Sequence, residues 1–109
     1  MNSQGALEAL RRVSKVAFGQ EHRLELMLAI AASEDGVCSL TELADTLQVR
    51  ASSLQRPLDS LVELSLLSIV PTGDTKYRHY LRNDGPAWDW AQDLATGVDV
   101  ARPVDAVAP

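Results

Sequence analysis

The chain has few of the residues that most often carry chemistry. Its 109 residues include one cysteine, Cys38, and two histidines, His22 and His79. A lone cysteine cannot form an internal disulfide, which suits a reducing compartment. The histidines are far apart and lack metal-ligand spacing, so we expect no metal site. There is no glycine-rich phosphate loop, and the carboxylates fall on the outer faces of the expected helices, so we expect neither a cofactor nor an enzyme.

Long apolar runs are also missing. No stretch is long enough to cross a bilayer, and the first residues lack the basic-then-apolar layout of a signal peptide. We therefore expect a cytoplasmic protein that does not bind membranes. The length suits one domain, which we place at residues 1–95. Residues 96–109 have no usable period and contain two prolines, so we expect a loose tail there.

Two amphipathic helices with a short turn between them are expected between Ser39 and Leu67. In the first helix, apolar residues recur at i, i+3, i+4 and i+7, and Ser39 with Glu42 fits a capping box. Residues 48–51 remain to turn the chain. The second helix, about 51–64, has a similar apolar stripe formed by Leu54, Leu58, Leu61 and Val62. This pattern is typical of a helix-turn-helix.

Other elements flank this pair. A first helix is expected from Ala6 to Phe18, with Gly19 able to take the left-handed cap and the basic residues Arg11, Arg12 and Lys15 on its outer side. A second helix, 21–32, is apolar over more than half its circumference, which is typical of a central helix. Val37 and Cys38 then suggest a short strand that could pair with a later hairpin.

A hairpin and a closing helix follow. Residues 66–70 and 76–82 are expected to form two strands around a turn at 71–74. The alternation of the return strand would place one set of residues on the core and the other outside, the outer set being Lys76, Arg78, Tyr80 and Arg82. The closing helix, from Ala87 to Ala95, contains both tryptophans, which need a surface to bury against.

Three segments resemble the winged helix-turn-helix of the ArsR type, the arsenic-repressor-like bacterial regulators. They are FGQEHRLELMLAIA, ADTLQVRASSLQRPLDSLVELSLL and KYRHYLR. The resemblance covers roughly residues 6–95, although MarR-type and other winged helices share this skeleton. It implies a mainly α (α+β) fold with a helical core, a two-stranded wing and a C-terminal helix. It also implies a dimeric, DNA-binding transcriptional repressor. Unlike metal-sensing relatives, the chain has no thiolate partners for Cys38, which we interpret as a small buried hydrophobe, with a redox thiol as the alternative.

The charge distribution agrees with DNA binding, although the net charge is −5. Residues 48–82, which span the second helix of the pair and the wing, hold five basic and three acidic residues. We expect base contacts in the major groove from Ser52, Ser53, Gln55 and Arg56. We expect contacts to the DNA backbone from Arg50, Lys76, Arg78, Tyr80 and Arg82.

The expected dimer interface comprises Leu7, Leu10, Trp88, Trp90 and Leu94, although the first helix could instead cover the core of a monomer. One residue opposes DNA binding. Pro57 lacks the N–H that a helix interior needs, so the recognition helix should either start late or kink. With the acidic total and the aromatic closing helix, this leaves a protein-protein interaction module as the alternative function.

Overall fold

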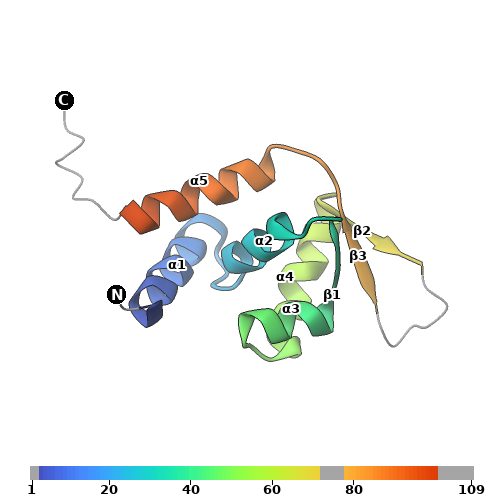
Figure 1. Cartoon of the computed structure of the whole chain (residues 1–109), viewed down its shortest axis with the longest axis horizontal. Helices are drawn as coiled ribbons and strands as arrows, with labels where there is room; N and C mark the ends of the chain where they lie inside the picture. Colours follow the sequence, from blue (N-terminus) through green and yellow to red (C-terminus); the bar gives the residue numbers. More distant parts are fainter. Residues whose placement is uncertain (1–2, 72–77, 101–109) are drawn as a thin grey trace.

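The computed structural model describes residues 3–71 and 78–100. In order, its elements are α1 (Ser3–Phe18), α2 (Arg23–Ala32), β1 (Val37–Ser39), α3 (Leu40–Leu47), α4 (Ala51–Glu63), β2 (Leu67–Val70), β3 (His79–Arg82) and α5 (Ala87–Val100). Figure 1 shows α2 between the α1/α5 pair and the α3/α4 pair, with the sheet at the opposite end of the described part from the start of α1 and the end of α5. This is a winged helix-turn-helix, as the sequence predicts. None of the helices in the described part is long and apolar enough to cross a membrane.

The central helix is α2. Its residues Leu24, Leu26 and Ile30 are fully buried, and the helix contacts all four other helices. Such burial on several sides requires apolar residues around most of the helix, which the sequence provides. The preceding helix, α1, ends as expected, with Gly19 at φ +74° and its N–H donating to the carbonyl of Lys15.

The helix-turn-helix corner is held by its caps. Ser39 and Glu42 form the predicted capping box at the start of α3, which satisfies backbone N–H groups there. Gln48, at φ +57°, ends α3 in the left-handed conformation, and α4 begins three residues later. Ser65, at φ +65°, ends α4 in the same way, and the N–H of Leu66 donates to the carbonyl of Leu61 as in a Schellman motif.

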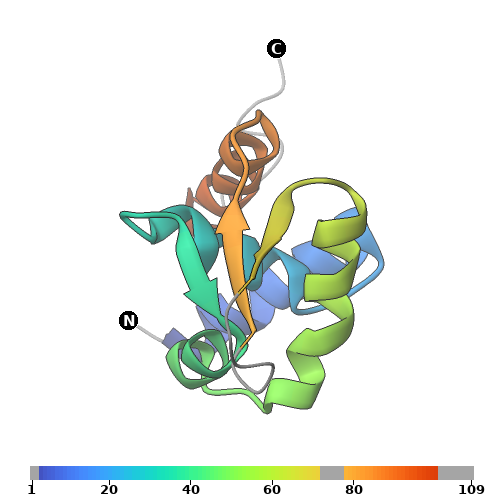
Figure 2. The same ribbon diagram turned by 90° about the vertical axis from the view of Figure 1, so that its right-hand side faces the viewer.

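The sheet has the strand order β1-β3-β2, with both pairs antiparallel. The predicted first strand is therefore confirmed, and Cys38 of β1 pairs with Tyr80 of β3. Figure 2 shows β3 between its two neighbours. The expected turn at 71–74 and Lys76 fall, apart from Pro71, outside the described residues.

The orientation predicted for β3 is wrong. Tyr80, expected outside, is 1% exposed and belongs to the core, whereas Leu81, expected inside, is 40% exposed. Alternation in the sequence identifies two faces but does not distinguish them when each carries an apolar residue. The face of β3 that packs on the core is the one that carries the tyrosine ring.

The closing helix is longer than expected. It extends to Val100, so the stretch from residue 96 to 100 is helical rather than part of a loose tail. Trp88 is buried at 7% exposure, and its indole Nε1 donates to the carbonyl of Asn83 at 2.7 Å. Because α5 packs on both α1 and α2, its Trp88 side belongs to the core of its own chain.

Candidate nucleic-acid interface

Helix α4 is anchored on one side and free on the other. Leu54, Leu58 and Leu61 are fully buried, which fixes the helix against the core. Ser52 and Arg56 are exposed, and Ser53 and Gln55 are half-buried. All four residues predicted to contact bases therefore lie in the first half of α4, ahead of Pro57. The amide of Gln55 donates to the carboxylate of Asp59 at 3.1 Å, so it is held along the helix surface.

The start of α4 suits an anion. Arg50 is the N-cap residue, and its side chain makes no capping hydrogen bond to the first turn, which contains no acidic residue. The backbone N–H groups of a helix start are unpaired within the helix and attract negative charge. Arg50 itself is exposed beside this start. The N–H of Ser53 already donates to the carbonyl of Arg50 at 2.9 Å, so a phosphate would find the backbone N–H groups ahead of Ser53 and a cation here.

Pro57 lies inside α4, so the alternative in which the helix starts late is wrong. The proline is buried, and α4 is assigned as one helix from Ala51 to Glu63. The hydroxyl of Ser60 donates to the carbonyl of Pro57 at 2.7 Å. Core packing of the residues around it offsets the hydrogen bond that proline removes, which costs about 3 kcal/mol in an unsupported helix interior.

Of the wing residues expected to contact the DNA backbone, fewer are exposed than predicted. Arg78 is exposed just before β3, where a cation could meet a phosphate. Lys76 lies outside the described residues. Tyr80 is buried and cannot reach DNA from the core.

The guanidinium of Arg82 lies against the end of α2. Its Nη1 donates to the carbonyls of Ile30 (2.7 Å), Ser33 (2.9 Å) and Ala31 (3.2 Å) at the end of α2. A guanidinium that satisfies these carbonyls caps the negative end of the helix dipole. These bonds argue against the assignment of Arg82 to the DNA backbone, because its charged group is engaged at the end of α2.

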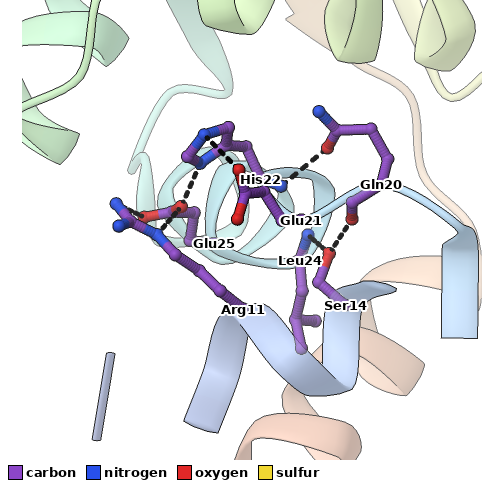
Figure 3. Close-up of polar contacts among 7 residues, drawn as sticks. All are labelled: Arg11, Ser14, Gln20, Glu21, His22, Leu24 and Glu25. Carbon is purple, nitrogen blue, oxygen red and sulfur yellow. Dashed lines mark hydrogen bonds and ion pairs between the residues drawn. The ribbon is translucent and has the colours of Figure 1, made fainter. Parts of the chain in front are cut away.

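A buried polar cluster at the corner between α1 and α2 was missed (Figure 3). The carboxylate of Glu25 is 4% exposed and accepts from Arg11 Nε at 2.7 Å and Nη2 at 3.3 Å. It also lies 2.6 Å from Nδ1 of His22. The hydrogen bond from Arg11 to Glu25 raises the pKa of Arg11. The expectation that Glu25 and Arg11 lie on outer faces is therefore wrong, because the two are paired at the corner between α1 and α2.

The signal for this cluster was present in the sequence. Glu25 interrupts the apolar run RLELMLAIA, and a charge in a helix that is buried on several sides needs a partner. Close by, the hydroxyl of Ser14 donates to the carbonyl of Gln20 and accepts from the N–H of Leu24 at 3.0 Å, again joining α1 to α2. The corner is therefore a structural joint. In the described part of the chain, no group of three or more His, Cys, Asp or Glu residues could hold a metal ion.

Of the residues expected at a dimer interface, one is buried in its own chain and the others are at least partly exposed. Trp88 is buried in its own chain and is unavailable to a partner. Trp90 is 48% exposed on α5, and its ring meets that of Phe18 edge to face at 5.2 Å. Leu7, Leu10 and Leu94 are half-buried. Val16, which was not predicted, is the most exposed large hydrophobic residue described, at 84%.

Cys38 is buried, and desolvation by burial raises the pKa of its thiol. A thiol that resists ionisation is a poor nucleophile toward oxidants. The geometry thus favours the interpretation of Cys38 as a small core residue.

No protein-family model and no curated protein match this chain. Solved structures do match it. A cysteine-to-serine mutant of MarR from E. coli is 20% identical with a TM-score of 0.64, over 97% of this chain and 82% of that one. AbsC, a MarR family transcriptional regulator from Streptomyces coelicolor, is 14% identical with a TM-score of 0.66, over 98% and 74%. Sco3205, a MarR family transcriptional regulator from the same organism in complex with DNA, is 17% identical with a TM-score of 0.64, over 93% and 68%.

At these identities the similarity establishes the fold alone. All three of these structures are of MarR-type proteins, and none of them supports the narrower ArsR resemblance. The chain has the winged-helix fold of these MarR-family structures.

Proposed function

We propose that the chain is a sequence-specific DNA-binding transcriptional regulator. Its α4 would enter the major groove, and the wing would lie on the phosphate backbone. The observation that carries this proposal is the exposure of Arg50, Arg56 and Arg78 on α4 and the wing, while the leucines of α4 fix it to the core. Sco3205, which has this fold, is described in complex with DNA.

The contacts divide by type. Arg56 and Gln55 can each make paired hydrogen bonds to a base, arginine to guanine and glutamine to adenine. Ser52 and Ser53 can reach a base edge or a phosphate from the first turn of α4. Arg50, Arg78 and Lys76 would contact phosphates, which fix the register of the protein without reading sequence. Tyr80 and Arg82 leave the predicted set because their side chains face the core.

We further propose a homodimer that represses. The exposed Val16 and Trp90, with Leu7, Leu10 and Leu94, place apolar surface on α1 and α5. Pairing through these helices would bring two α4 helices to successive major grooves, about 34 Å apart on one face of the duplex. A dimer seated on a promoter would block polymerase. Such a regulator works where the chromosome lies, so we place it in the cytoplasm.

A salt series tests DNA binding. Affinity for a mixed-sequence duplex should fall steeply with salt, because each phosphate contact adds about 0.9 to the slope of log K against log salt. Replacing Arg56 and Arg78 by alanine should lower affinity by at least tenfold. Each replacement that removes a phosphate contact should also lower the slope by about one.

The matched control is Arg12→Ala, an exposed cation of α1 that lies outside the proposed surface. It removes the same charge and should leave both affinity and slope almost unchanged. Equal losses for Arg12→Ala and Arg56→Ala would show that only overall charge matters and would reject the assigned surface.

A second candidate function is a protein-protein interaction module. It is favoured by the exposure of Trp90 and Val16 on the side of the molecule that carries α1 and α5. On this hypothesis the chain would show no DNA binding even at low salt and would bind a different protein through these helices. The two candidates are therefore separated by the same salt series.

A further inference from the structure

Arg23, the first residue of α2, reaches across to α4. Its Nη2 donates to the hydroxyl oxygen of Ser60 at 2.8 Å. The same hydroxyl donates to the carbonyl of Pro57 at 2.7 Å. One serine therefore joins the central helix to the proline turn of α4.

This turn is the weakest point of α4. Pro57 has no N–H to donate to the carbonyl of Ser53, so one bond between the two halves of the helix is missing. A serine that bonds back to the preceding turn, as Ser60 does, tends to bend a helix. Both features act where the half that carries residues 52–56, held to the core by Leu54, joins the half that is fixed by Leu58 and Leu61. The direction of the first half thus depends on the packing of Leu54 and on what supports this turn.

Arg23 is itself held in place from the other side. Its guanidinium carbon lies 5.6 Å from the centre of the Phe18 ring, at the end of α1, and Trp90 of α5 meets that ring edge to face. Its Nε is buried and, within the described residues, has no hydrogen-bond partner. A buried donor without a partner reduces stability, which offsets part of the stabilisation from the contacts that Arg23 makes with Ser60 and Phe18.

We infer that Arg23 is a positioning residue that acts through Ser60 to set the direction in which the first half of α4 leaves the core. This inference rests on the proposed DNA binding, because it assigns Arg23 a role in presenting Gln55 and Arg56 to bases. Arg23 itself touches no DNA.

The test measures DNA affinity for Arg23→Ala, Ser60→Ala and the double variant, at a temperature where each is fully folded by circular dichroism. Each single replacement lowers affinity by up to about tenfold, because losing this hydrogen bond can shift α4 away from its binding direction by no more than the free energy that the bond contributes. The double variant loses no more than the larger single loss, because both changes break the same link. The salt slope stays at the wild-type value, and Arg23→Lys, which keeps a donor, recovers part of the affinity.

Hydrogen exchange gives a readout that does not depend on DNA. In Arg23→Ala the amides of residues 53–56 should exchange faster than in the wild type, while those of residues 58–63 keep their protection. Arg12→Ala is the control and should change neither measurement.

Three results would overturn the inference. The first is wild-type affinity in Arg23→Ala together with unchanged exchange at residues 53–56. The second is a salt slope lowered by about one, which would make Arg23 a direct phosphate contact. The third is a general increase in exchange, which would indicate only a loss of stability. If the wild-type protein fails to bind any duplex, the proposed function fails, and the exchange experiment alone decides the role of Arg23.

Discussion

Replacing Arg82 by methionine separates the role seen in the structure from the role predicted by the sequence. Methionine keeps the apolar stem of the side chain and removes the guanidinium. The carbonyls of Ile30, Ala31 and Ser33 at the end of α2 then lose their shared donor. If these bonds hold the wing to α2, the replacement must lower the free energy of unfolding.

The size of the loss follows from the contacts. Nη1 has two hydrogens for three carbonyls, so about two full hydrogen bonds are lost. A hydrogen bond to a charged group contributes about 1.5–3 kcal/mol, and Arg82 is half-buried, so the lower end applies. We expect Arg82→Met to lower the free energy of unfolding by about 3 kcal/mol. For a domain of this size that corresponds to a fall in Tm of about 12–24 °C.

Urea unfolding followed by tryptophan fluorescence and circular dichroism measures this loss. Arg78→Met, which removes an exposed cation four residues away, is the control and should stay within about 0.5 kcal/mol of the wild type. The reasoning is refuted if Arg82→Met is as stable as that control. It is also refuted if Arg82→Met keeps its stability but lowers the salt slope for DNA by about one, because Arg82 would then contact a phosphate.

Three further predictions concern the Glu25–Arg11 pair, the buried thiol of Cys38 and the hydrogen-bonded carboxylate of Asp35. Glu25→Ala strands the guanidinium of Arg11 and should cost about 2–3 kcal/mol by urea unfolding, whereas the joint replacement Glu25→Leu with Arg11→Met should cost less; equal losses would contradict an ion-pair role. Cys38 should react with iodoacetamide at pH 8 at least about tenfold more slowly in the folded protein than in urea, because burial raises the pKa of its thiol; equal rates would mean that it is accessible. The N–H of Val37 and the hydroxyl of Ser33 lower the pKa of Asp35, so the stability difference between wild type and Asp35→Ala should be present above the ordinary aspartate pKa of about 3.9 and disappear as the pH falls through the lower folded value. A difference in urea midpoint that persists at pH 2 would contradict that assignment.

The sequence predicts the helical part of this fold well because the relevant signals are local. Apolar residues three and four apart define the buried side of α3 and α4. Ser39 with Glu42 marks the start of α3, and the glycine after Phe18 marks the end of α1. Each of these signals depends on residues within one or two turns, so a single sequence is enough to identify them.

The sequence does not predict which side of β3 faces the helices, because its alternation is the same for both orientations. The orientation is decided by which face of the sheet packs on the helical core, and that face carries Tyr80. Once that orientation is set, Arg82 must point inward as well, and it moves from the expected DNA surface to the end of α2.

In the candidate site, too, the sequence predicts the features that depend on local spacing, and only the folded chain shows those that depend on packing. The spacing of leucines along residues 51–64 is enough to give α4 a leucine side and a polar side, and so to predict that Arg56 is exposed. The pairing of Glu25 with Arg11 and of Arg23 with Ser60 became visible in the folded chain, because these partners lie 14 and 37 residues apart. Contacts over such separations depend on how the helices pack, and helical periodicity carries no information about packing between helices.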